Sequence, residues 1–127
     1  MNEPKGHPKK IIVADDEPDI FGALHYRLAK KGYEVITAVD GKEALEKVGQ
    51  YKPDLMILDN LMPFLRGLDV CQRMRGDDGL RHIPVILITA CTAALNEEVL
   101  RSAGVNDSIL KPYEPEELFK KVRKLIG

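Results

Sequence analysis

Five short runs rich in apolar residues recur along the chain, and longer segments of mixed polarity separate them. The middle run reads Leu-Met-Ile-Leu-Asp and has turn-forming residues on both sides. A run of this length and composition is typical of a strand buried on both faces of a sheet. The sequence therefore predicts five strands, at residues 10–14, 33–39, 55–59, 84–88 and 108–110.

The segments between these runs repeat apolar residues every three or four positions, which predicts amphipathic helices. Gly32 and Gly104 stand where a glycine ends a helix, and Pro115 suits a first helical turn. The predicted helices are 19–31, 40–50, 68–75, 92–103 and a last one from Pro115. Strands that alternate with helices predict the α/β class, with a parallel sheet covered by helices on both faces.

The composition fits one intracellular domain. The chain has 127 residues and a formal net charge of −1, so we expect no direct binding to nucleic acid or to membranes. Its apolar runs are far shorter than the ~18 residues of a membrane span. Only two cysteines, Cys71 and Cys91, occur on separate elements, which is typical of a reduced, cytoplasmic protein. We expect a flexible N-terminal segment at residues 1–9 and a single domain at 10–127.

Acidic residues stand at the ends of two predicted strands. Asp15 and Asp16 directly follow the first strand, and Asp59 closes the middle one. Parallel strands end at a common edge and lie ~4.8 Å apart, so these carboxylates should converge. Converging carboxylates repel one another, and Mg²⁺, which prefers oxygen ligands, would relieve that repulsion. The sequence therefore predicts a magnesium site at this edge.

Two more polar residues follow the remaining strands of the same edge. Thr89 stands at the end of the fourth predicted strand and supplies a hydroxyl group, and Lys111 follows the fifth and supplies a positive charge. A carboxylate nucleophile, a metal, a cation and a hydroxyl are the groups that phosphoryl transfer uses. The pattern therefore predicts transfer of a phosphoryl group to Asp59.

Four motifs at these strand ends give the chain a family resemblance. In order and in position, they resemble the receiver domain of bacterial two-component response regulators, over residues 10–126. The resemblance implies a flavodoxin-like, doubly wound sheet of five parallel strands in the order 2-1-3-4-5, with five helices. The motifs are Asp15-Asp16-Glu17, Asp59-x-x-Met62-Pro63, Thr89-Ala90 and Lys111-Pro112.

The resemblance also implies a role for each residue of the edge. Asp59 would accept the phosphoryl group from a sensor histidine kinase or a phosphotransfer protein, and the domain would catalyse only its own phosphorylation and dephosphorylation. Thr89 and Lys111 would hold the phosphoryl oxygens. Mg²⁺ would be bound by side chains of Asp16 and Asp59, by the backbone carbonyl of Leu61, and by Asp15 directly or through a water.

Two positions depart from the family pattern. Ser108 stands where receivers usually carry the aromatic residue of their switch, and Arg66 stands where an acid is common. Without that aromatic, we expect a signal to pass through the loop after Thr89 and the helix at 92–103.

Two alternative functions remain open from the sequence. One is an interaction module of this fold that no longer needs phosphate, and the other is a Mg²⁺-dependent phosphohydrolase with an aspartate nucleophile. The phosphohydrolases carry a D-x-D motif after the first strand, whereas this chain has adjacent acids there. The sequence names neither the kinase nor the output partner, and an effector domain could belong to a longer protein.

Overall fold

The computed structural model describes residues 8–90 and 96–127, and their five strands form one parallel sheet in the order β2-β1-β3-β4-β5. Strands and helices alternate along the chain, which confirms the predicted class, strand order and element order. The elements are β1 (Lys10–Ala14), α1 (Pro18–Lys30), β2 (Glu34–Ala38), α2 (Gly41–Tyr51), β3 (Leu55–Asp59), α3 (Gly67–Arg75), β4 (Val85–Thr89), α4 (Glu97–Ala103), β5 (Asp107–Leu110) and α5 (Pro115–Ile126).

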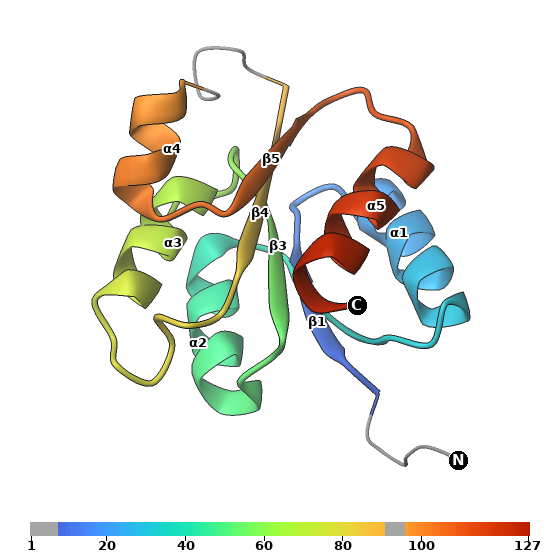
Figure 1. Ribbon diagram of the computed structural model, residues 1–127, viewed down its shortest axis with the longest axis horizontal. Helices are drawn as coiled ribbons and strands as arrows, with labels where there is room; N and C mark the ends of the chain where they lie inside the picture. The colour runs from blue at the N-terminus through green and yellow to red at the C-terminus, as the bar shows by residue number, and fades with distance from the viewer. Residues whose placement is uncertain (1–7, 91–95) are drawn as a thin grey trace.

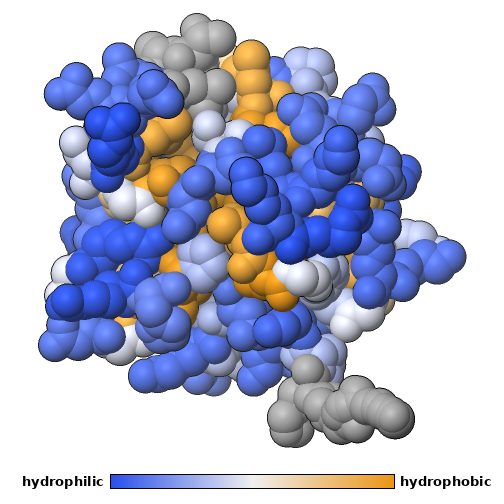
Figure 2. Space-filling model, in the orientation of Figure 1, coloured by the Kyte–Doolittle hydropathy of each residue, from blue (hydrophilic) through white to orange (hydrophobic). Residues whose placement is uncertain are grey.

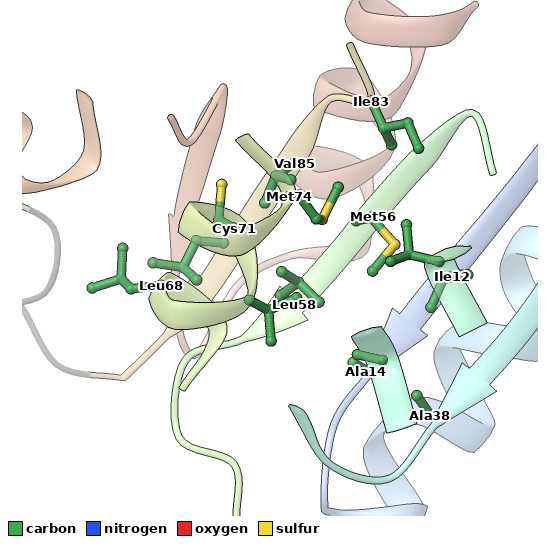
Figure 3. Packing of buried hydrophobic residues seen from close by; sticks show 14 of the residues in the cluster. Ile12, Ala14, Ala38, Met56, Leu58, Leu68, Cys71, Met74, Ile83 and Val85 are labelled. Carbon is green, nitrogen blue, oxygen red and sulfur yellow. The ribbon is translucent and has the colours of Figure 1, made fainter. Parts of the chain in front are cut away.

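Helices cover both faces of the sheet and enclose two apolar cores. Helices α2, α3 and α4 lie on one face, and α1 and α5 lie on the other (Figure 1). Successive residues of a strand point to opposite faces, so Met56 and Leu58 enter the first core, while Leu55 and Ile57 enter the second. Figure 3 shows the first core, where side chains of α3 pack against β3 and β4. All five residues of β3 are buried, as the central apolar run predicts.

Apart from the start of α4, the ends of the elements follow the predicted signals to within a residue or two. Gly32 has a φ of +99°, a left-handed conformation that suits glycine and ends the turn after α1. Asp40 caps α2, because its Oδ1 accepts a hydrogen bond from the backbone N–H of Glu43 at 2.7 Å. Helix α4 begins at Glu97, and residues 92–95 of the predicted helix lie outside the described residues.

The first seven residues of the predicted flexible segment also lie outside the described residues, and β1 begins at Lys10. None of the helices in the described ranges has the length and apolar character needed to cross a bilayer.

Strand register brings the polar residues of the chain to one edge. Ala14 pairs with Leu58, and Asp59 pairs with Ile88 of the next strand. Thr89 pairs with Leu110, which directly precedes Lys111. Because all strands run in the same direction, Asp15, Asp59 and Lys111 emerge beside one another at the carboxyl end of the sheet.

Candidate functional site

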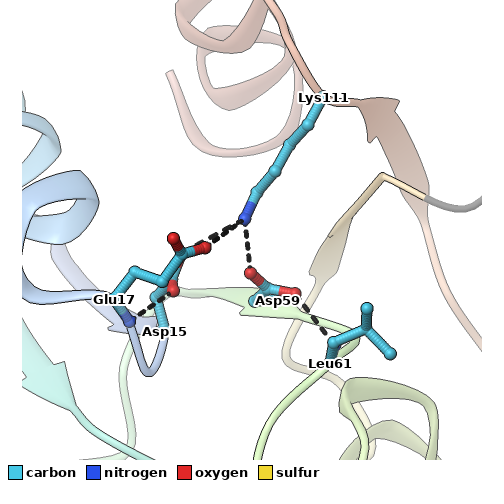
Figure 4. A network of polar contacts seen from close by, with 5 residues as sticks. All are labelled: Asp15, Glu17, Asp59, Leu61 and Lys111. Atoms are coloured by element: carbon cyan, nitrogen blue, oxygen red, sulfur yellow. Dashed lines mark hydrogen bonds and ion pairs between the residues drawn. The ribbon is translucent and has the colours of Figure 1, made fainter.

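A lysine and a buried aspartate form the centre of the carboxyl edge. The ammonium nitrogen (Nζ) of Lys111 lies 2.5 Å from Oδ2 of Asp59. The same nitrogen lies 3.7 Å from Oδ2 of Asp15 and 3.6 Å from Oε1 of Glu17. Figure 4 shows the Lys111 side chain pointing between Asp59 and the other two acids. One cation therefore contacts three carboxylates, which come from two strand ends and the loop after β1.

The fold changes the ionisation of Asp15. Its side chain is buried, with 2% of the residue exposed, and its Oδ1 accepts a hydrogen bond from the backbone N–H of Glu17 at 2.9 Å. The pKa of Asp15 is raised to about 6: burial is the largest cause, the nearby Asp59 adds to the rise, and the Glu17 N–H and Lys111 oppose it. Asp15 therefore carries a carboxyl group that titrates well above the usual range.

Lys111 supplies part of the charge compensation that the sequence analysis assigned to a divalent cation. Only 18% of its side chain is exposed, and burial alone would lower its pKa. The hydrogen bond to Asp59 and the charges of Asp59, Asp15 and Glu17 outweigh burial and raise the pKa of Lys111. The ammonium group is therefore held in its charged form among the acids.

The backbone around Asp59 fixes the second oxygen of its carboxylate. The backbone N–H of Leu61 donates to Oδ1 of Asp59 at 2.9 Å (Figure 4). The side chain of Leu61 projects outward and is 60% exposed. Thr89 is fully buried at the end of β4, and its carbonyl accepts a hydrogen bond from the backbone N–H of Lys111 at 2.8 Å. Together with the contact between Lys111 and Asp59, these hydrogen bonds connect the carboxyl ends of β3, β4 and β5.

Four acids in the described residues could hold a metal ion together. Asp15, Asp16, Glu17 and Asp59 each offer one carboxylate oxygen, and these atoms lie within 4.8 Å of one another. Asp16 and Glu17 are exposed, so the cluster opens to solvent on one side. Oxygen ligands of this charge suit a hard divalent cation such as Mg²⁺. Glu17 was not among the predicted metal ligands, which included Asp15, Asp16 and Asp59; its position in the fold adds it to the cluster.

The residues that hold the loop after β3 were not among those predicted from the sequence. Asn60 is buried, and its Oδ1 accepts a hydrogen bond from the backbone N–H of Leu68 at 3.1 Å. A Cβ at Gly67 would lie 2.8 Å from the carbonyl oxygen of Asp59, so only glycine allows α3 to begin this close to the site. Two features of the sequence could have indicated them: an asparagine directly after the strand and a glycine at the start of the next helix.

The two departures from the family pattern have local consequences. Ser108 is half-buried on β5 and lies beside a hollow of about 290 Å³ between β5 and α4. Arg66 contacts Asp69, with 3.1 Å between Nε and Oδ2, and this hydrogen bond holds the pKa of Asp69 below its usual range. The predicted signal path runs through the loop after Thr89. Residues 91–95 of that loop, Cys91 among them, lie outside the described part of the chain.

Comparison with known proteins agrees with this geometry. The family model described as the response regulator receiver domain matches residues 11–123. The alkaline phosphatase synthesis transcriptional regulatory protein PhoP of Bacillus subtilis is 38% identical over 118 residues, which cover 93% of this chain and 48% of that protein. The chain thus spans about half the length of the curated relatives it matches.

Solved structures of similar proteins share the fold. A response regulator of Chloroflexus aurantiacus superposes with a TM-score of 0.86 at 32% identity, covering 93% of this chain and 97% of that one. The response regulator TrrA of Thermotoga maritima, solved in complex with Mg²⁺–BeF, has a TM-score of 0.84 at 36% identity, covering 93% and 99%. On its fold, its strand-end motifs and these matches, the chain belongs to the response regulator receiver domain family.

Proposed function

We propose that this domain accepts a phosphoryl group on Asp59 in a Mg²⁺-dependent reaction and thereby switches the binding of a partner. The contact of Lys111 with Asp59, inside a cluster of acids, is the observation that carries this proposal. In the transfer, an oxygen of the Asp59 carboxylate forms a bond to phosphorus as the bond between phosphorus and the donor breaks. Asp59 suits this role because it lies buried at the strand end and its carboxylate clusters with those of two exposed acids, Asp16 and Glu17.

The residues around Asp59 would each perform one task. The N–H of Leu61 and the ammonium of Lys111 orient the carboxylate, since each donates to a different oxygen. Lys111 would then hold an oxygen of the transferred group by its charge, and the Thr89 hydroxyl would donate to another. Orientation and charge stabilisation are the main contributions that a protein makes to phosphoryl transfer.

A magnesium ion would be held by Asp15, Asp16 and Asp59, with the backbone carbonyl of Leu61 as a further ligand. The clustering of the carboxylate oxygens supports this assignment. When bound, Mg²⁺ supplies positive charge for the phosphoryl oxygens. The receiver domain of a sensor histidine kinase from Pseudomonas aeruginosa, 27% identical to this chain, was solved with a magnesium ion in its active-site cleft.

The partners follow from the family. The donor would be a phosphohistidine on a sensor histidine kinase or a phosphotransfer protein, and the domain would catalyse only its own phosphorylation and dephosphorylation. Curated relatives include DNA-binding response regulators, so an effector domain is one candidate for the output. A cytoplasmic location fits the buried thiol of Cys71, whose pKa burial raises to about 11.

Incubation with acetyl phosphate and Mg²⁺, followed by intact-mass measurement, tests the proposal. We expect the protein to gain one phosphoryl group, and we expect EDTA to prevent the gain. Asp59→Asn should gain nothing. Asp54→Asn is the matched control, because Asp54 lies at the opposite end of β3 and its carboxylate accepts a hydrogen bond from the backbone of Lys10.

Three results would contradict the proposal. The parent protein could remain unmodified, the gain could persist in Asp59→Asn, or it could be insensitive to EDTA. An unmodified parent would favour an interaction module that needs no phosphate. Rapid turnover of added phosphate esters by the parent would favour a phosphohydrolase instead.

A further inference from the structure

A groove between α1 and α5 lies outside the candidate site. It encloses about 510 Å³, and a second hollow of about 320 Å³ adjoins it, because both are lined by Lys31 and Phe119. Figure 2 shows hydrophilic residues over much of the side on which these two helices lie. We call the first hollow the basic groove; its lining residues are Tyr26, Arg27, Lys30, Lys31, Glu116 and Phe119.

Positive charge predominates in and beside the basic groove. Arg27, Lys30 and Lys31 line it, Arg123 lines the adjoining hollow, and Glu116 is the one acid among the groove's lining residues. All four cations are exposed, and none forms an ion pair with a side chain that the structure describes. By contrast, Lys111, Arg66 and Lys121 are each paired with a carboxylate. The whole chain has a formal net charge of −1, so this surface is more positive than the protein is on average.

Aromatic rings hold two of these cations in place without neutralising them. The Nζ of Lys31 lies 4.6 Å from the ring centre of Phe119, which is 3% exposed and forms the floor. The Nζ of Lys30 lies 5.4 Å from the ring centre of Tyr26, which is 63% exposed. Cation–π contacts restrict an ammonium group and leave its charge available to an anion. The groove therefore offers oriented positive charges next to an exposed aromatic ring.

The shape of the basic groove favours a polypeptide over a small molecule. Small-molecule sites enclose their ligand with mostly apolar walls and a few polar groups, whereas this groove is lined largely by exposed charged ends. Tyrosine and arginine are also the residues that contribute most at protein interfaces. A partner's side chain can pack on Tyr26 while its carboxylates reach the surrounding cations.

The charges around the groove favour a short acidic segment over a long polyanion. Beyond the groove, Glu117 stands in the first turn of α5, and the start of α1 follows the acidic cluster of the site. A nucleic acid or an anionic membrane extending past the groove would meet these carboxylates. Arg27 and Lys31 are four residues apart on α1, a rise of about 6 Å. Two carboxylates one helical turn apart, or on alternate residues of a strand, match that spacing.

We propose that the basic groove docks an acidic segment of a partner protein, which carries two or more carboxylates about 6 Å apart and an apolar side chain for Tyr26. Arg27, Lys31 and Arg123 would pair with the carboxylates. Docking here uses none of the residues that surround Asp59. The groove can therefore bind a partner whether or not the phosphoryl chemistry proposed above is correct.

Fluorescence anisotropy with a labelled synthetic peptide tests this proposal. The probe has glutamate at every third or fourth position with leucines between, and a second peptide replaces each glutamate by glutamine. The test variant is Arg27→Gln, Lys31→Gln and Arg123→Gln together. The control variant removes the same charges elsewhere, by Lys42→Gln, Arg73→Gln and Arg101→Gln on α2, α3 and α4, where all three side chains are exposed.

We expect the glutamate peptide to bind the parent and the control variant, and to bind the test variant at least about tenfold more weakly, with affinity falling as salt rises. The glutamine peptide should not bind. Amide NMR signals of residues 26–31 and 116–123 should shift on addition of the glutamate peptide. Tyr26→Ala should weaken binding as well, because the ring contributes contact area.

Several outcomes overturn the proposal. The glutamate peptide could fail to bind the parent, or both triple variants could lose equal affinity, which would indicate only non-specific attraction. A DNA duplex or an anionic phosphatidylserine vesicle could bind the parent through the same residues when the peptide does not. Circular dichroism of both variants separates loss of binding from loss of fold, and mass gain from acetyl phosphate reports on Asp59 independently.

Discussion

Lys111 and Asp59 are 52 residues apart in the chain, and their charged atoms lie 2.5 Å apart in the fold. The side chain of Asp59 is 5% exposed and that of Lys111 is 18% exposed, so water screens this ion pair only in part. The same ammonium group is within 4 Å of Asp15 and Glu17. The stability of the metal-free domain should therefore depend on this one cation.

Replacing Lys111 by Gln should lower the free energy of unfolding of the metal-free protein by about 2 kcal/mol, because it leaves buried carboxylates without their counter-charge. Mg²⁺ should then raise the melting temperature of Lys111→Gln more than that of the parent. Urea unfolding with EDTA, and thermal unfolding with and without Mg²⁺, measure the two effects. Lys121→Gln is the control: its pair with Asp107 is more exposed, so its loss should cost less than about 1 kcal/mol. Equal losses of unfolding free energy in Lys111→Gln and Lys121→Gln would contradict the prediction.

Asp15 should make the domain less stable as pH rises. Its pKa in the folded protein, about 6, lies above the ordinary value of 3.8, so the folded state holds the proton more tightly than the unfolded state. The stabilisation from that proton is complete below the ordinary value and is lost as pH rises through about 6.

Asp15→Asn should remove this pH dependence and raise the free energy of unfolding at neutral pH by about 1–2 kcal/mol, after allowance for solvent screening. Asp16→Asn is the control, because Asp16 is exposed and should change the profile less. Urea unfolding with EDTA at several pH values across this window measures the difference between variant and parent. A steeper or unchanged profile in Asp15→Asn would be the contrary result.

The difference between Asp15 and Asp16 also marks where sequence reasoning reaches its limit. The two acids are adjacent and chemically identical, and a strand-end motif selects them together. The fold separates them: Asp15 is 2% exposed, accepts a hydrogen bond from the backbone N–H of Glu17 and contacts Lys111, whereas Asp16 is exposed. The strands and the edge that gathers the polar residues could be predicted from apolar periodicity and from the alternation of strands with helices, whereas the order of the strands came from the family resemblance. Distances between side chains from different strands depend on packing that no local pattern encodes.

Arg75 shows the same limit away from the site. In the sequence it is one basic residue in the last turn of a helix, where bases are common. In the fold its guanidinium group donates to the carbonyl oxygens of Gly104 at 3.0 and 2.9 Å and of Ile83 at 2.8 Å. It thereby ties α3 to the end of α4 and to the segment before β4. These partners are up to 29 residues away, so only the folded chain identifies them.

Phe64 should be a point of removable strain. Its φ is +72°, a left-handed conformation that costs an ordinary residue about 1–2 kcal/mol, and its side chain is 80% exposed and gains little from packing. Phe64→Asn should raise the free energy of unfolding by about 1 kcal/mol, since asparagine tolerates this conformation. Phe64→Ala keeps the Cβ that causes the strain and should give no gain. Chemical unfolding of the parent and the two variants measures these free energies. If Phe64→Ala gained as much stability as Phe64→Asn, backbone strain at this position would not be the cause.

If Asp59 carries a phosphoryl group, Leu61 should make that group long-lived. Hydrolysis needs a water molecule held in line with the bond between Asp59 and phosphorus, and orienting that water lowers the barrier. The hydrogen bond from its backbone N–H to Oδ1 holds Leu61 next to Asp59, and its side chain, 60% exposed, faces the solvent from which a water molecule would come. A leucine side chain has no group that can hold water, whereas an amide at the same position can accept or donate a hydrogen bond.

Leu61→Asn should therefore speed the loss of the phosphoryl group by about tenfold. Leu61→Met is the matched control, because it keeps an apolar side chain of similar size and should leave the rate within about twofold of the parent. After phosphorylation and removal of the donor, intact mass measured over time gives the three rates. If Leu61→Met accelerated the loss as much as Leu61→Asn, freer access of water rather than its orientation would control the rate. If neither variant differed from the parent, another group near Asp59 would already hold the water.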